Sequence, residues 1–406
     1  MKIIEGGVCA AKGFSANGLW CGIRKNKTKK DLALIVCEVP CTAAAVYTAN
    51  LVKGAPLIVN QAHLRDGRAQ AVICNSGIAN TCNADGIEVA KKMAELAGQA
   101  LGLPAADVLV GSTGVIGQPL PVAPIAAALP ELAAGLSADA AGSDRAEAAI
   151  MTTDTQPKSI AVAFELDGKV CHLGGIAKGS GMIHPNLATM LVYLTTDAAI
   201  SAEMLQAALS EDVRHTFNMT SVDGDTSTND NVILMASGLA GNTPVTAPGE
   251  AFSTFMQALN TVTVALCRMI AGDGEGATRL LECSVTGAAD EAAAKTIAKA
   301  VICSSLVKAA MFGADANWGR VLCAIGYAGA PVDVSRVAVT FRSAAGEVLV
   351  CENGSGVAFS EEEAKAILLE KEIDIVIALG DGDASATAWG CDLTYDYVKI
   401  NGEYRT

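Results

Sequence analysis

The residues most able to do chemistry lie near the middle of the 406-residue chain, in the stretch 178–196. This stretch begins as a glycine-bracketed loop around Lys178. It then becomes a run of five apolar residues from Met190, a pattern typical of a strand buried on both faces. Thr189 therefore stands where a loop enters a predicted strand, a position in which a hydroxyl can be held still. We take Thr189 as a candidate nucleophile and the bond between Ala188 and Thr189 as a candidate cleavage site.

A threonine hydroxyl is a weak nucleophile unless a base lies beside it. No histidine-centred triad spacing is visible, and His184 lies five residues upstream in a predicted loop. Cleavage before Thr189 would free its α-amino group, whose reference pKa of roughly 7.7–8.0 leaves a neutral fraction near pH 7. Cleavage would therefore supply the base.

Two further segments could serve such a nucleophile. Small residues in 110–117 would expose backbone N–H groups and the Thr113 hydroxyl, as in an oxyanion hole, although a phosphate-binding or merely tight turn is the alternative. Segment 151–158 places three threonines around one aspartate. Its hydroxyls could recognise a polar substrate, or it could be a capping and turn segment.

Three polar segments of the C-terminal half are also candidates. In 272–278 three glycines let the backbone approach a ligand, and Glu275 could hold a cationic group, with calcium as the competing ligand. Segment 223–230 is interpreted as a structural turn network near a site. The tail after Ile400 is expected to be frayed, or tied to a sheet and so able to reach a site.

Composition narrows the class of protein. Hydrophobic residues make up 51% of the chain, and its length favours two lobes over a single core. A net charge of −14 argues against nucleic acid and anionic membranes as partners. The 13 cysteines form no CxxC pairs and the four histidines are scattered, so we expect reduced thiols, a cytoplasmic location and no metal or cofactor. We expect neither a signal peptide nor a membrane span.

Strand and helix patterns alternate along the whole chain and predict an α+β fold with sheets packed between helices. A hairpin is expected over 160–173, turning at Asp167-Gly168. Strands are predicted at 32–39, 43–47, 56–59, 71–74, 232–236, 337–341, 348–351, 373–379 and 391–400. Helices are predicted at 85–101, 125–136, 143–151, 203–209, 250–271, 290–311 and 361–369.

Eight segments in order resemble the bifunctional glutamate N-acetyltransferase/ornithine acetyltransferase family of arginine biosynthesis, over essentially the full length. They are 111–114, 151–155, 177–182, 185–191, 221–230, 272–278, 313–320 and 397–406. The resemblance implies a layered αββα-like sandwich resembling N-terminal nucleophile enzymes, with a second, smaller α/β lobe in the C-terminal half.

The resemblance also implies an activity. Self-cleavage at Ala188–Thr189 would give an α chain, 1–188, and a β chain, 189–406, assembled as α2β2 or larger. Thr189 would carry acetyl from N2-acetylornithine to glutamate by a ping-pong mechanism, and whether acetyl-CoA is also a donor stays open. The family's oxyanion hole corresponds to Thr113 and Gly114. Its substrate-contacting positions correspond to Thr152 (with Thr153 and Thr155 as neighbours), Lys178, Thr189, Glu275, Asn401 and Thr406.

Two other functions are weighed against this one. A self-processing aminopeptidase or amidohydrolase would use the same nucleophile with water as acceptor. A non-enzymatic amino-acid-binding protein would stay uncut. The pair Lys178 and Glu275 suits a zwitterionic amino acid and favours transfer.

Overall fold

The computed structural model describes residues 1–184 and 190–403, which form two compact units. Unit 1 comprises residues 1–179, 190–217 and 226–266, and unit 2 comprises 180–184, 218–225 and 267–403. Each unit therefore takes segments from both halves of the chain. Both combine sheets with helices, which confirms the predicted α+β fold and its smaller C-terminal lobe.

Unit 1 is built on a nine-stranded sheet whose order does not follow the sequence. Strand β8 is parallel to β9 and antiparallel to β7, and all of its residues are buried, as the apolar run predicted. The order is β1 (Lys2–Ile4), β6 (Ser159–Leu166), β7 (Lys169–Lys178), β8 (Leu191–Thr196), β9 (Asn231–Ala236), β3 (Leu32–Tyr47), β4 (Arg68–Ile78) and β5 (Val108–Val115), and β2 (Phe14–Leu19) pairs with β3.

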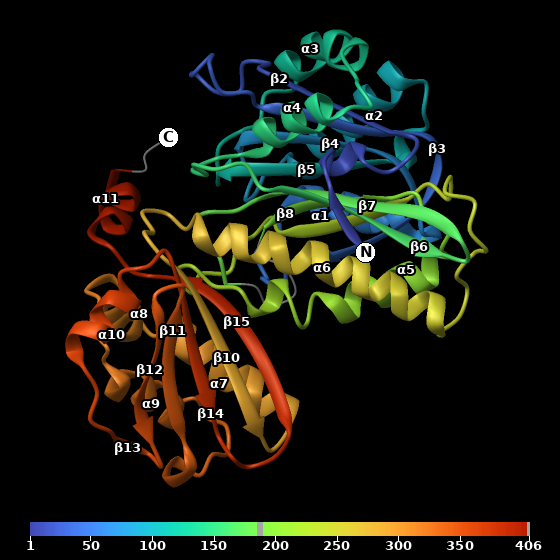
Figure 1. Cartoon of the computed structure of the whole chain (residues 1–406). Helices are drawn as coiled ribbons and strands as arrows, with labels where there is room; N and C mark the ends of the chain where they lie inside the picture. The colour runs from blue at the N-terminus through green and yellow to red at the C-terminus, as the bar shows by residue number, and fades with distance from the viewer. Residues whose placement is uncertain (185–189, 404–406) are drawn as a thin grey trace. The chain divides into compact units, whose positions relative to one another are not determined.

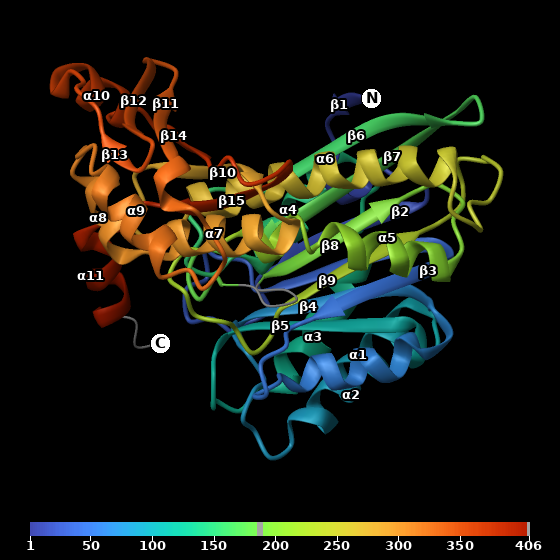
Figure 2. The ribbon, with the colours of Figure 1, turned by 90° about the horizontal axis from the view of Figure 1, so that it is seen from below.

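Helices cover both faces of this sheet. On one face α1 (Ala55–His63), α2 (Gly86–Leu101) and α3 (Val122–Ala134) share a core with β4 and β5. Figure 2 shows α1 and α2 alongside these strands. On the other face α4 (Ala140–Ile150) packs with β2 and β3. Helix α5 (Ala202–Asp212) packs on β3, and α6 (Glu250–Gly272) contacts β6 through an edge-on pair of rings, Phe164 and Phe255.

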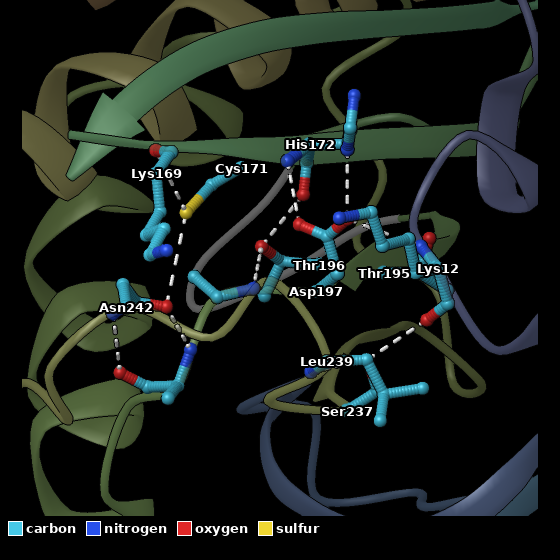
Figure 3. A network of polar contacts seen from close by, with 12 residues as sticks. Lys12, Lys169, Cys171, His172, Thr195, Thr196, Asp197, Ser237, Leu239 and Asn242 are labelled. Carbon is cyan, nitrogen blue, oxygen red and sulfur yellow. Dashed lines mark hydrogen bonds and ion pairs between the residues drawn. The ribbon is translucent and has the colours of Figure 1, made fainter.

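Strand β8 is anchored at its C-terminal end by the buried carboxylate of Asp197 (Figure 3). One oxygen accepts the backbone N–H of His172 at 2.6 Å, and the other lies 2.7 Å from Nδ1 of the same imidazole. The second oxygen also accepts the backbone N–H of Lys12 at 3.2 Å. Asp197 thereby ties the end of β8 to β7 and to the N-terminal segment.

Unit 2 holds a six-stranded sheet with helices packed on it (Figure 1). Helix α7 (Glu291–Cys303) packs on β10 and β15, and α10 (Glu361–Leu368) on β11 and β12. Helices α8 (Ser305–Phe312) and α9 (Trp318–Gly326) contact α7, and α11 (Tyr395–Glu403) follows the last strand. The strand order is β13 (Ser355–Gly356), β12 (Gly346–Glu352), β11 (Ala338–Ser343), β14 (Glu372–Ala378), β10 (Leu280–Ala288) and β15 (Ala384–Cys391).

Three predicted elements are wrong. Segment 56–59 is helical, within α1, because Pro56 suits a first helical turn and a four-residue apolar run cannot distinguish strand from helix. Segment 391–400 is not a strand, since β15 ends at Cys391 and α11 begins at Tyr395. The long helix predicted at 290–311 is broken at Ser304, whose hydroxyl accepts the N–H of Val307 and starts α8.

Within the described residues, α6 alone is long and apolar enough to cross a membrane. Half of the apolar stretch of α6 is buried in the protein. None of the thirteen cysteines, all of which lie in the described ranges, is in a disulfide. Residues 1–184 and 190–403 contain no group of three or more His, Cys, Asp or Glu side chains placed to hold a metal ion.

At the edge strand β5, one side chain makes the backbone hydrogen bonds that a further strand would make. Asn60, fully buried in α1, donates to the carbonyl of Val110 at 2.8 Å and accepts its N–H at 2.7 Å. We expect Asn60→Ala to lower the free energy of unfolding by about 2–3 kcal/mol, because two buried backbone groups lose their partner. Urea unfolding measures this. The exposed neighbour Gln61 provides the control, and equal effects of Asn60→Ala and Gln61→Ala would contradict the prediction.

Candidate active site

Lys178 is the last residue of β7 and points at the strand that carries the predicted oxyanion hole. Its side chain is only 8% exposed, and Nζ lies 3.5 Å from the hydroxyl of Thr113 on β5. Lys178 is paired with Leu191, the first residue of β8. Two predicted site residues that are 65 positions apart in sequence are thus brought into contact.

Segment 110–115 is a strand, so its interpretation as a tight turn is wrong. Gly114 has φ of +126° and its strand partner Gly77 has φ of +109°, conformations that favour glycine. A Cβ on Gly114 would come within 2.3 Å of the Gly77 backbone, so the close approach of these strands requires glycine. The glycines in this motif allow two strands to approach closely.

The N–H of Gly114 faces the outer edge of the sheet. Backbone groups of alternate residues in a strand point to the same side. Asn60 takes both backbone groups of Val110, and the amide of Asn229 donates to the Ser112 carbonyl at 2.9 Å. Both bonds lie away from β4, so alternation places the Gly114 N–H on that edge, where an oxyanion could accept it.

Asn229 braces this region. Its amide nitrogen also donates to the carbonyl of Ala79, and its oxygen accepts from Thr81 and Thr228, the latter at 2.6 Å. All three side chains are buried. Segment 223–230 was predicted to be a structural turn network, and this part of it holds β5 in place.

The threonine-rich segment is organised by the buried carboxylate of Asp154. Its Oδ1 accepts the N–H of Gly179 at 2.7 Å and the ammonium of Lys158 at 2.8 Å, and its Oδ2 accepts the N–H of Thr152 at 2.8 Å. Burial would raise the pKa of Asp154, but the ammonium groups of Lys178 and Lys158 hold it well below its usual range. The backbone N–H groups of Thr152 and Gly179 are therefore both held by the Asp154 carboxylate.

The nucleophile and the cleavage site, Thr189 and Ala188, lie outside the described residues. The structure does fix the neighbour of Thr189, because the carbonyl of Met190 accepts the N–H of Asn231 at 2.9 Å. Strands β8 and β9 then continue in parallel register from Leu191 and Asn231.

Unit 2 brings together two more predicted site residues. Glu275, 9% exposed, accepts the side-chain amide of Asn401 at 2.7 Å. Its backbone N–H donates to the carbonyl of Ser180 at 2.9 Å. A Cβ on Gly181 would lie 2.4 Å from the Glu275 carboxylate, so a side chain at this position would displace the carboxylate. The tail was expected to fray or join a sheet, but Asn401 sits on helix α11.

The predicted residues thus fall into two groups. Unit 1 joins Thr113, Gly114, Thr152 and Lys178 through direct contacts and through Asp154, whereas unit 2 joins Glu275 and Asn401. Thr406 lies beyond the last described residue. No role was predicted for Asp154, Lys158 or Asn229. In the sequence, Asp154 and Asn229 are only a carboxylate and an amide among hydroxyl residues.

Glu147, on α4, is a buried acid with one oxygen that has no partner among the described residues. Burial raises its pKa from 4.5 to about 7, although Lys158 opposes the shift. The folded protein therefore binds more protons than the unfolded chain between these values, and its stability must fall as pH rises. We expect ionisation of Glu147 to lower the free energy of unfolding by about 3 kcal/mol as the pH is raised from 4.5 to above 7.

Denaturant unfolding of Glu147→Gln between pH 4 and 8 checks this, because the variant should lose that part of the pH dependence. Glu131→Gln, at an exposed position of α3, is the matched control. Identical pH profiles for the wild type and Glu147→Gln would show that Glu147 is not the titrating group.

The chain matches the ArgJ family model over residues 15–406. The arginine biosynthesis bifunctional protein ArgJ of Caldanaerobacter subterraneus subsp. tengcongensis is 50% identical over 407 residues, covering 100% of both chains. The protein of that name from Symbiobacterium thermophilum is 51% identical over 409 residues, again covering 100% of both. The crystal structure of arginine biosynthesis bifunctional protein ArgJ from Bacillus halodurans has 46% identity and a TM-score of 0.50, covering 53% of this chain and 98% of that one.

The resemblance inferred from the eight motifs is thus confirmed by similarity along the full length. With a family match that omits only the first 14 residues and relatives that share about half of its residues, this chain belongs to the ArgJ family.

Proposed function

We propose that this chain is an acetyltransferase that moves the acetyl group of N2-acetylornithine to glutamate. The observation that carries the proposal is the full-length similarity to proteins named for arginine biosynthesis. The contact between Lys178 and Thr113 supports it, because this contact joins a cation for a substrate carboxylate to the proposed oxyanion hole.

The enzyme first cuts itself. The Thr189 hydroxyl oxygen attacks the Ala188 carbonyl carbon, the C–N bond breaks as the ester bond forms, and the hydroxyl proton passes to the released amine. Water then hydrolyses the ester and leaves chains of 188 and 218 residues, with Thr189 at a new N-terminus. Residues 189–406 would be 54% of the chain (218 of 406), close to the 53% that the Bacillus halodurans chain covers.

Transfer then follows in two half-reactions. The free amine of Thr189 takes the hydroxyl proton as the oxygen attacks the acetyl carbonyl, and the Thr113 hydroxyl and Gly114 N–H stabilise the oxyanion. Ornithine leaves with the proton, and acetyl-threonine remains. Glutamate attacks that ester through its amino group and leaves as N-acetylglutamate, which restores the hydroxyl.

Charge decides which substrates fit. Lys178 binds the α-carboxylate common to ornithine and glutamate, and Glu275 binds the side-chain ammonium of ornithine. Thr152, Asn401 and Thr406 complete the proposed contacts. The anchoring of the Thr152 N–H by Asp154 supports Thr152 as the contact from the threonine-rich segment.

The two chains stay together as α2β2 or a larger form in the cytoplasm, and the chemistry uses no metal or cofactor. The relatives are named as bifunctional proteins, so acetyl-CoA is included in the assays as a candidate second acetyl donor.

Self-cleavage is tested by denaturing electrophoresis with mass spectrometry. We expect two chains of 188 and 218 residues, the second beginning at Thr189, and a single uncut chain for Thr189→Ala. If Thr189→Ala were still cut at the same bond, Thr189 would not be the nucleophile. An uncut wild-type chain would favour a binding protein.

The transfer reaction is tested by mixing acetylornithine with labelled glutamate in the absence of acetyl-CoA. We expect labelled N-acetylglutamate and free ornithine in equal amounts. Acetate without acetylglutamate would mean that water is the acceptor and that the chain is an amidohydrolase. A parallel reaction with acetyl-CoA and glutamate tests the second donor.

Glu275→Gln should raise KM for acetylornithine by about 10-fold or more, because a hydrogen bond to a charged group contributes roughly 1.5–3 kcal/mol. KM for glutamate and the extent of self-cleavage should change much less. Glu370→Gln, an exposed glutamate of the same unit, is the control. Equal loss of acetylornithine binding, glutamate binding and cleavage would give Glu275 a structural role instead.

A further inference from the structure

The residues just before the proposed cleavage segment are held by one short segment of unit 2, Ser221–Asp223, which we call the anchoring segment. Asp223 accepts the N–H of Met182 at 2.6 Å on Oδ2 and the N–H of Ile183 at 2.9 Å on Oδ1. The N–H of Val222 donates to the Ile183 carbonyl at 2.7 Å.

The anchoring segment also holds the following residue and is itself fixed. The Ser221 hydroxyl lies 3.1 Å from Nδ1 of His184, and the Ser221 N–H donates to the carbonyl of Trp389 on β15 at 2.8 Å. Ser221, Val222 and Ile183 are almost fully buried. Three consecutive residues, 182–184, are therefore held by three others attached to a sheet.

Met182 is the strained residue of this arrangement. Its φ is +57°, a region that side chains other than glycine rarely adopt. Its side chain is 43% exposed, so packing of the side chain does not account for the conformation. What holds it is the Asp223 carboxylate, since its two oxygens accept successive N–H groups on either side of the Met182 carbonyl.

We propose that Asp223 is a positioning residue for self-cleavage, which holds Met182 at positive φ and so aims the chain that leads to Ala188. The inference rests on the proposed cleavage. A change of φ at Met182 would change the direction in which the chain enters Ile183 and His184, the last described residues before the proposed cleavage site. The reacting hydroxyl and carbonyl must be aligned for the bond between Thr189 Oγ1 and the Ala188 carbon to form as the C–N bond breaks, so a chain held in one direction reacts faster. The other end of the segment is fixed by the bond between Met190 and Asn231.

The test follows cleavage of the full-length chain with time after cell-free translation. Asp223→Ala should slow the appearance of the two chains at least 10-fold, equivalent to about 1.4 kcal/mol in the barrier. Adding Met182→Gly to Asp223→Ala should recover most of the rate, because glycine adopts positive φ without an anchor. Met182→Gly alone should cut at the wild-type rate, as should Asp225→Ala, which removes a neighbouring exposed carboxylate.

Cleavage of Asp223→Ala within twofold of wild type would overturn the inference. So would failure of Met182→Gly to restore that variant, because Asp223 would then act by another route. Thermal unfolding in the Thr189→Ala background shows whether each variant folds. If Asp223→Ala does not fold, Asp223→Asn, which keeps one acceptor oxygen, takes its place with the same rescue. A wild-type chain that is never cut would reject the proposed function itself.

Discussion

A buried carboxylate, Asp154, is the point on which the candidate site in unit 1 depends. It lies between two ammonium groups, those of Lys158 and Lys178, and both Asp154 and Lys158 are fully buried. A buried charge is tolerated only when it is paired and its hydrogen bonds are satisfied, so the backbone must bring N–H groups to it. Thr152 and Gly179 supply those groups. The hydrogen bonds that this buried anion requires thus fix the backbone at Thr152 and at the end of β7.

The rest of unit 1 serves the same region from the sheet. Strand β5 is an edge strand, and an edge normally exposes backbone groups that can pair with another chain. Here the amides of Asn60 and Asn229 satisfy part of that edge, and the N–H of Gly114 lies further along it. The oxyanion hole proposed here would use a donor that the sheet leaves unpaired.

Strand β8 links this arrangement to the proposed nucleophile. Its residues are all buried, its first residue pairs with Lys178, and its far end is tied by Asp197. The residue that follows the proposed nucleophile, Met190, is fixed by the hydrogen bond from Asn231. The glycine-rich segment before the proposed nucleophile is held separately by Asp223, which binds the strained residue Met182. The buried strand and the strained residue thus lie in different parts of the chain.

The sequence alone determined the α+β class, the buried strand after Thr189 and the family, and it predicted the candidate site residues, because these depend on local patterns and on motifs. That these residues fall into two groups was decided by the tertiary structure. It did not determine that α1 and α11 are helices, since short apolar runs fit strands and helices equally. It also gave no sign that Asp154, Asn229 and Asp223 organise the site. Each of them holds backbone that lies 25 to 150 positions away in the chain, at Gly179, Met182 and Ala79, so only the tertiary structure could pair a carboxylate or amide with it.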